Sequence, residues 1–214
     1  MRGLALHMGA LALCLTLLMA AGAQAMGMFG PSRPTDVKFN DASHPATPVM
    51  VDGLTVNGVS MGRFPVLAST RWMNPRGGTA TLTRMPWDGE DDLFVDVEAR
   101  WTEIATGRAF RAEVSVPWEA LSVEDLVAPT ARLTFVYGRN GEFWLYTANP
   151  DDEGTGQING RQVARVCGTR TPNRDQNYGL RVNEIQGLGR LIDRRDQWMA
   201  MEKLATECTG RAGA

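Results

Sequence analysis

The sequence predicts a mainly β domain with a C-terminal helix, an α+β fold in which one helix covers an antiparallel sheet or sandwich. Residues 93–101 and 110–116 alternate apolar and polar side chains with a period of two, which is typical of half-buried antiparallel strands. Asn140-Gly141 separates two further apolar runs, as in a β-hairpin. Residues 187–207 carry apolar side chains at helical spacing. These three patterns together favour one β-rich domain.

The first 25 residues have the composition of a secretory signal peptide. Arg2 supplies a short positive region, an apolar run extends from Leu4 to Ala21, and Ala23-Gln24-Ala25 is a small-x-small cleavage motif. The alternative is a membrane anchor, but a spanning helix needs about 20 apolar residues and no basic stop follows the run. We therefore expect cleavage near Ala25, a periplasmic or secreted mature chain, and no membrane span within it.

Residues 26–48 contain many Pro, Gly, Ser and Asp residues and few that could be buried. Such a composition is typical of a chain without a core, so we expect a flexible N-terminal arm, followed by a single domain at 49–210. Asp52-Gly53 and Asn57-Gly58 predict turns between short strands early in that domain. Residues 79–87 predict another strand.

The two alternating segments, 93–101 and 110–116, are expected to pair as a hairpin. A four-residue loop would place Glu98 opposite Glu113, and like charges in direct opposition are unfavourable. A slip of two residues would instead place Glu98 opposite Arg111. The sequence alone leaves both registers open.

Residues 131–147 are expected to form a second hairpin, with Asn140-Gly141 as a two-residue type I′ loop, because both residues tolerate the positive φ that this turn needs. The resulting pairs would be Tyr137 with Trp144 and Phe135 with Tyr146. We expect this aromatic face to be mainly core, with Trp144 nearest the edge. If the face were exposed instead, Trp144 and Tyr146 could stack on a sugar ring.

Cys167 and Cys208 are the two cysteines that follow the signal peptide. In an exported protein the default expectation is a disulfide, which here would join a strand at 161–167 to a helix at about 187–207. The apolar stripe of that helix consists of Leu188, Leu191, Trp198, Met201, Ala205 and Cys208. The alternative is two separate buried thiols.

Residues 149–160 are acidic and rich in glycine. Asn149, Asp151 and Glu153 stand at the first, third and fifth positions of an EF-hand count, but the twelfth position is Gly160, where the loop needs a bidentate Glu. An EF-hand is therefore excluded and a looser calcium site stays open. No metal and no cofactor is assigned.

Residues suited to catalysis are sparse in this chain. His44 is the only histidine after the signal peptide and lies in a polar stretch, which argues against a Ser-His-Asp or Cys-His site and against a histidine zinc site. Asp96 and Glu98 share one face of their strand and are candidates for acid and base in glycoside hydrolysis. A solvated strand face is the simpler interpretation of this pair, so we predict that the protein is not an enzyme.

The segments "VEARWTEIATGRAFRAEVSVPWEAL" and "RLTFVYGRNGEFWLY" resemble a family of uncharacterised bacterial envelope proteins, often lipoproteins, classed under a domain of unknown function. The matching positions are Trp101, Phe110, Pro117, Gly138 and Gly141. The family has no established activity, so the resemblance implies an envelope location and no functional site. This chain departs from the lipoprotein pattern because it has no credible lipid-site cysteine.

Composition and motifs together indicate a binding role. Removal of Arg2 leaves 21 basic residues (22 minus one) and 24 acidic residues, a formal charge of −3, and no basic block suited to a phosphate backbone stands out. Nucleic acid is therefore not an expected partner. We predict a secreted, non-catalytic interaction protein, with another envelope protein as partner, and an inhibitor or immunity role by analogy. The alternatives are a carbohydrate-binding module that uses Trp144 and Tyr146, and a glycoside-acting enzyme that uses Asp96 and Glu98.

Overall fold

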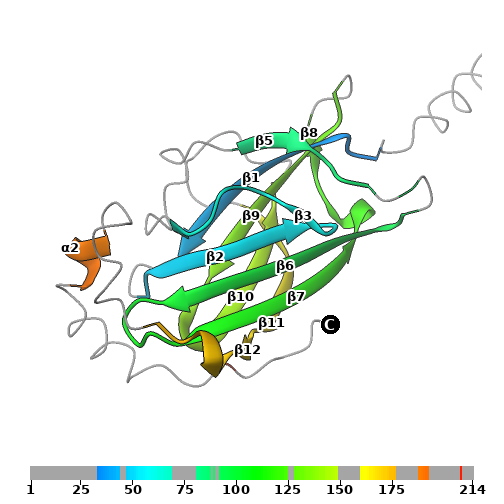
Figure 1. Ribbon diagram of the computed structural model, residues 1–214. Coiled ribbons are helices and arrows are strands. Elements are labelled where there is room, and N and C mark those ends of the chain that lie inside the picture. The colour runs from blue at the N-terminus through cyan, green and yellow to red at the C-terminus, as the bar shows by residue number, and fades with distance from the viewer. Residues whose placement is uncertain are drawn as a thin grey trace, which may run out of the picture. The chain divides into compact units, whose positions relative to one another are not determined.

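The computed structural model describes residues 33–43, 47–68, 81–87, 89, 92–124, 128–148, 160–176, 188–192 and 208. They belong to one compact unit, Arg33–Ala214, in which two sheets stack face to face (Figure 1). The mainly β fold expected from the sequence is confirmed. None of the described helices has both the length and the hydropathy to cross a membrane. The expected signal peptide and the acidic stretch 149–159 lie outside the described residues.

The first sheet, sheet A, has the strand order β11-β10-β9-β1-β5, and β8 pairs with the start of β9. Its strands are β1 (Asp36–Ser43), β5 (Thr81–Arg84), β8 (Val123–Glu124), β9 (Thr130–Tyr137), β10 (Glu142–Thr147) and β11 (Arg161–Cys167). Every pair is antiparallel except β1 with β9, which is parallel. Parallel neighbours need a long connection, and here that connection contains most of the second sheet.

The second sheet, sheet B, has the strand order β12-β7-β6-β2-β3, and β4 also pairs with β2. Its strands are β2 (Val49–Val56), β3 (Val59–Ser60), β4 (Val66–Leu67), β6 (Phe94–Glu103), β7 (Ala109–Pro117) and β12 (Thr169–Arg170). All of these pairs are antiparallel. Burial alternates along β7 and over the first half of β6, so one face of sheet B packs on the core and the other meets solvent.

Trp101 of β6 occupies the centre of an aromatic cluster between the sheets and is fully buried, as its position on the apolar face predicts. Its ring lies 5.7 Å from that of Phe110 in sheet B, and 5.3 Å and 5.9 Å from those of Tyr137 and Phe143 in sheet A. Aromatic pairs at such separations stabilise beyond the area they bury. The cluster therefore joins the two sheets at one end of the sandwich.

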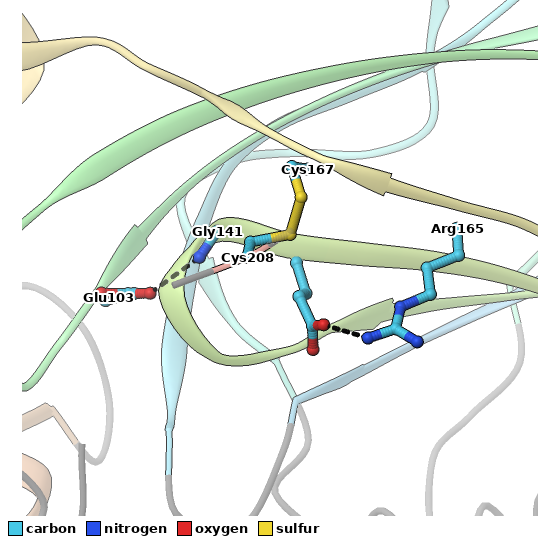
Figure 2. The surroundings of a disulfide bond; sticks show 6 residues. Glu103, Gly141, Arg165, Cys167 and Cys208 are labelled. Carbon is cyan, nitrogen blue, oxygen red and sulfur yellow. Dashed lines mark hydrogen bonds and ion pairs between the residues drawn. A yellow bond between two sulfur atoms is a disulfide. The ribbon is translucent and has the colours of Figure 1, made fainter. Parts of the chain in front are cut away.

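The chain passes from sheet A to sheet B at Gly168, between β11 and β12. The Gly168 N–H donates to the Gly141 carbonyl at 2.7 Å, and a Cβ on Gly168 would approach the Trp101 ring to 2.6 Å. Cys167, just before this corner, forms the predicted disulfide with Cys208 (Figure 2). The disulfide therefore ties Cys208 to the end of β11, beside this corner.

The structure corrects the expectation of a flexible arm for residues 36–43, while residues 26–32 and 44–46 lie outside the described residues. Residues 36–43 form β1, which lies between β9 and β5 in sheet A (Figure 1). Val37 and Phe39 are buried, and the Phe39 ring lies 6.2 Å from that of Phe135. Composition misled here because a strand needs only a few apolar side chains on one face when a neighbouring sheet supplies the rest of the core.

The hairpin of β9 and β10 has a register one residue away from the expected one. Its loop has three residues, Arg139–Gly141, instead of two, with positive φ at Asn140 and Gly141. The observed pairs are Tyr137 with Phe143, Val136 with Trp144, Phe135 with Leu145 and Thr134 with Tyr146. A shift of one residue moves every side chain of a strand to the opposite face. The expected pairs of Tyr137 with Trp144 and Phe135 with Tyr146 are therefore wrong.

The hairpin of β6 and β7 adopts the first of the two registers considered, with Glu98 opposite Glu113 and Arg100 opposite Arg111. The expected turn at Asn57-Gly58 is present, with positive φ at both residues. Asp52-Gly53 is not a turn, because β2 continues through it with a bulge in its pairing to β6.

The described helical elements are short. They are the 3₁₀ turns at Trp118–Ala120, Arg139–Gly141 and Pro172–Arg174, and α2 (Leu188–Ile192). Leu188 is fully buried, which agrees with its place on the predicted apolar stripe. Residues 193–207 lie outside the described residues, so the cover of a sheet by a helix at 187–207 stays a prediction.

Candidate functional site

The outward-facing side chains of sheet B form the first candidate site. Because β6 and β7 alternate, their second face presents polar groups to solvent, and the pairing of the two strands sets these groups side by side. A shallow depression of about 490 Å³ is lined there by Thr55, Gly58, Asp96, Val97, Glu98, Glu113, Val114 and Ser115. We call this depression the acidic groove. It contains both carboxylates that the sequence singled out, together with a third, from Glu113, that only the register reveals.

Two arginines lie beside the acidic groove and neutralise part of its charge. The Arg111 guanidinium contacts Glu98 at 3.1 Å and Glu113 at 2.5 Å, and Arg100 Nε lies 3.6 Å from Glu98. The like charges that face each other across β6 and β7 are therefore paired diagonally and along the strand with opposite charges. Among the described residues, the exposed carboxylate of Asp96 has no ion pair.

Asp96 is positioned by the turn that joins β2 to β3. The Asp96 N–H donates to Asn57 Oδ1 at 2.8 Å, and the Asn57 N–H donates to the Asp96 carbonyl at 2.7 Å. These two bonds fix the turn, and with it Gly58, against β6. One rim of the acidic groove is thereby held by one backbone–backbone hydrogen bond and by one from a backbone N–H to the Asn57 side chain.

Exposed apolar residues lie at the start of β6 and just before it, on the Asp96 side of the groove. Leu93 is 56% exposed and Phe94 is 47% exposed, and Phe94 precedes Asp96 by two residues on the same strand face. Along β6, this face of sheet B thus passes from apolar at Phe94 to acidic at Asp96 and Glu98, and then to basic at Arg100. Such a surface suits a partner that offers complementary charge beside an apolar contact.

The acidic groove does not have the environment of a glycosidase site. In such enzymes one carboxyl group lies in an apolar pocket, where it acts as an acid, and the other activates water or attacks the sugar. Asp96 is exposed to solvent, and Glu98 contacts two guanidinium groups. Neither carboxyl group is in an apolar pocket.

Trp144 and Tyr146 form the second candidate site, on the outer face of sheet A. The observed register turns both side chains away from the core, so the expectation that they belong to a core face is wrong, and both are half-buried. The Arg165 guanidinium lies 5.6 Å from the Trp144 ring centroid, and the Tyr146 hydroxyl donates to Gln162 Oε1 at 3.3 Å. Burial raises the pKa of Tyr146.

The outer face of sheet A is largely covered around β9. Val136 on that face is fully buried, and Thr134 is 9% exposed. With the core on its inner side, β9 is thus buried on both faces. The rings of Trp144 and Tyr146 lie on the neighbouring strand β10 and are half-buried.

A polar pair lies near the C-terminal end of β1, with Tyr137 fully buried and Asp41 partly buried. Asp41 points toward the core, where its Oδ1 accepts a hydrogen bond of 3.4 Å from the Tyr137 hydroxyl. Burial is the main cause that raises the pKa of Asp41 to about 6, and burial together with Asp41 raises that of Tyr137. The sequence analysis missed this group because it assigned residues 26–48 to an arm.

Glu103 is a fully buried carboxylate, and both of its oxygens accept hydrogen bonds. Its Oε2 accepts hydrogen bonds from the Thr106 hydroxyl at 2.7 Å and from Arg108 Nη2 at 2.8 Å. Its Oε1 accepts one from the Gly141 N–H at 3.1 Å (Figure 2). Arg108 also donates to Asn140 Oδ1 at 2.8 Å. The group joins the loops of two hairpins, so we assign it a structural role.

Within the described residues, no group of three or more His, Cys, Asp or Glu side chains is arranged to hold a metal ion. Comparison with protein-family models, with curated proteins and with solved structures finds no match for this chain.

Proposed function

We propose that the protein is an exported, non-catalytic binding protein whose partner is another envelope protein. The partner would dock on the outer face of sheet B and present positively charged side chains to the acidic groove. The observation that carries this proposal is the groove itself, where three carboxylates line one depression on a solvent-facing sheet. The exposed carboxylate of Asp96 is the group best placed to receive a cationic side chain.

The apolar border gives the same face a second means of recognition. Interfaces gain most of their affinity from a few buried apolar or aromatic anchors, while complementary charges contribute specificity and association rate. Phe94 would be such an anchor, since a partner seated on the groove would cover it. A protein segment with a basic residue beside an apolar one matches this arrangement.

An exported location agrees with the disulfide between Cys167 and Cys208, since such bonds persist in oxidising compartments. A binding role without catalysis agrees with the solvated setting of Asp96 and with the pairing of Glu98 to two arginines. An inhibitor or immunity protein works in this way, by occupying the surface of its target, and this is the form of binding role that we favour.

Binding to a labelled peptide tests the acidic groove directly. The probe is a short lysine-rich peptide with one aromatic residue, and its fluorescence anisotropy is followed at low and at physiological salt. Asp96→Lys should weaken binding by about tenfold or more, because it reverses the charge at the groove. Glu119→Lys is the matched control, since Glu119 is exposed on the 3₁₀ turn outside the groove.

The groove is the wrong site if the two variants weaken peptide binding equally, because a general charge effect would then explain the result. It is also wrong if the unaltered protein does not bind the peptide more tightly than a neutral peptide of the same length. A broad hydrolase screen is the complementary test. Turnover that Asp96→Asn abolishes would show an enzyme instead.

Carbohydrate binding at Trp144 and Tyr146 is the second candidate. The specific observation in its favour is the register that places both rings on the outer side of β10, with the polar side chains of Gln162 and Arg165 beside them. Aromatic rings with polar neighbours are suited to sugar stacking. Neutral oligosaccharides should then quench tryptophan fluorescence, and Tyr146→Ala should abolish the quenching. An unchanged emission spectrum would remove this candidate.

A further inference from the structure

We propose that β1 is an exchangeable strand, so that β1 of one copy of this chain can occupy the place between β9 and β5 in a second copy. This inference concerns sheet A and does not depend on the groove of sheet B. It follows from where β1 lies, from what it pairs with and from the polar groups that it buries.

Release of β1 would break strand pairs in sheet A alone. It is the first strand that the structure describes, and it pairs only with β9 and β5. Among the described residues β5 in turn pairs only with β1. The next strand, β2, belongs to sheet B, and the link between them contains Pro45 and Pro48. Withdrawal of β1 would therefore leave the pairs of sheet B intact.

The second half of β1 buries polar atoms that have no partner. Within the described part of the chain, Asn40 Oδ1 and Ser43 Oγ are buried without a hydrogen bond, and so is Thr47 Oγ1 just after the strand. Ser43 and Thr47 are both fully buried. Buried polar groups are nearly always hydrogen-bonded, and each exception destabilises the folded state. Here the exceptions are Asn40 and Ser43 in the second half of β1 and Thr47 shortly after it.

Asp41 lies among these unpartnered groups and adds to their effect. Its carboxyl group faces the core with a hydrogen bond of 3.4 Å from Tyr137, which is long for an O–H···O contact. Val37, Phe39 and Ala42 are the buried apolar residues that oppose release. Apolar anchoring is thus strongest in the first half of β1, and the second half is the part that would separate first.

A second copy is the natural occupant of the vacated place, because its β1 reproduces every contact of the original strand. Domain swapping of this kind creates a dimer at little cost in free energy, since the closed and exchanged forms share the same interactions. The groups that destabilise β1 would therefore affect the rate of exchange, through the open form, rather than the final balance of monomer and dimer.

Cysteine pairing between differently tagged copies tests the exchange. Asn40 and Thr134 are register partners in the parallel pair of β1 and β9, and neighbouring strands are spaced closely enough for a disulfide. One copy carries Asn40→Cys and the other Thr134→Cys. After the two are mixed at pH 8 and then oxidised, a covalent dimer that contains both tags is expected on a non-reducing gel.

Three further variants serve as controls for the cysteine-pairing experiment. Asn40→Cys mixed with Thr55→Cys should give no dimer above background, because Thr55 lies on β2 in sheet B. The double variant Asn40→Cys/Thr134→Cys in one chain should close internally, which shows that the pair can form. Asp41→Asn should slow formation of the mixed dimer by about tenfold, because it removes a partly buried charge that faces the core and makes opening rarer.

Exchange is refuted if the double variant closes internally while the mixed copies give no more dimer than the Thr55→Cys control after prolonged incubation. The role assigned to the second half of β1 is refuted if Asp41→Asn accelerates formation of the mixed dimer, since the polar groups of that half would then not control opening. These results would leave the proposed role of the acidic groove unaffected.

Discussion

The two sheets of this sandwich share one core and differ in their outer faces. On β7 the outward residues are exposed, and the strand alternates between core and solvent. On β9 the outward residues Thr134 and Val136 are buried as well, and only Arg132 is exposed. A strand of this sandwich can therefore be half-solvated in one sheet and covered on both sides in the other. The solvated face carries the groove, and the covered face limits what Trp144 and Tyr146 can bind.

Lysine substitutions on the two outer faces should show the largest difference in the free energy of unfolding. Val136→Lys places a charge at a fully buried position and should lower the free energy of unfolding by about 3 kcal/mol or more. Ser115→Lys places the same side chain on the exposed face beside three carboxylates and should change it by less than about 0.5 kcal/mol. Urea unfolding at pH 7 measures both. Similar losses in the two variants would mean that the faces do not differ in cover.

Two turn glycines provide the next comparison, because both have positive φ. A Cβ on Gly141 would lie 2.5 Å from the Phe110 ring, whereas a Cβ on Gly58 meets no atom within 4 Å. Gly58→Ala should cost about 1 kcal/mol from backbone strain alone. Gly141→Ala should cost about 3 kcal/mol, since the ring must also move. Thermal unfolding of both variants tests this. Equal shifts would show that the loop of β9 and β10 is not pressed against sheet B.

These contrasts show which parts of the fold could be predicted from the sequence. The alternation in β6 and β7 predicted the inward and outward faces correctly, because a strand with one solvated face carries polar residues on that face and apolar residues on the other. Asn140-Gly141 marked the second hairpin, but the pair fits both a two-residue and a three-residue loop. The choice depends on contacts outside the hairpin, such as that of Phe143 with Trp101, which is distant in sequence.

The candidate sites were predicted only in part for the same reason. Asp96 and Glu98 could be placed on one strand face, but the contribution of Glu113 required the register of two strands. Asp41 could not be identified, because β1 pairs in parallel with a strand that begins at Thr130. No local pattern in residues 26–48 predicts that pairing.

The partly buried carboxyl group of Asp41 in β1 should make the stability of sheet A sensitive to pH. The pKa of Asp41 rises from its ordinary value of 3.8 to about 6 in the folded protein, so the folded state binds a proton more tightly than the unfolded state. Stability from this group is therefore full below pH 4 and is lost as the pH rises from about 4 to 6. A shift of this size corresponds to about 3 kcal/mol at most.

The variant Asp41→Asn should remove that dependence. It should unfold at higher urea concentration than the unaltered protein at pH 8, with a gain of up to about 3 kcal/mol, and the gain should vanish near pH 3. Asp96→Asn is the control, since Asp96 is exposed on the other sheet and its replacement should change stability little at either pH. A gain at pH 3 equal to that at pH 8 would show that packing, and not charge, destabilises β1.

The smallest expected effect lies on the solvated face, at Arg111. Its guanidinium pairs with Glu98 and Glu113, which face each other across β6 and β7. Arg111→Gln leaves those two carboxylates opposed, yet the groups are solvated, so the loss should stay below about 1 kcal/mol. Because salt screens exposed charges, the loss should shrink when urea unfolding is repeated at about 1 M NaCl. A loss of stability that persists in high salt would mean that the outer face of sheet B is less exposed to solvent than the burial pattern of β7 indicates. The outer faces of the two sheets would then differ less in their exposure.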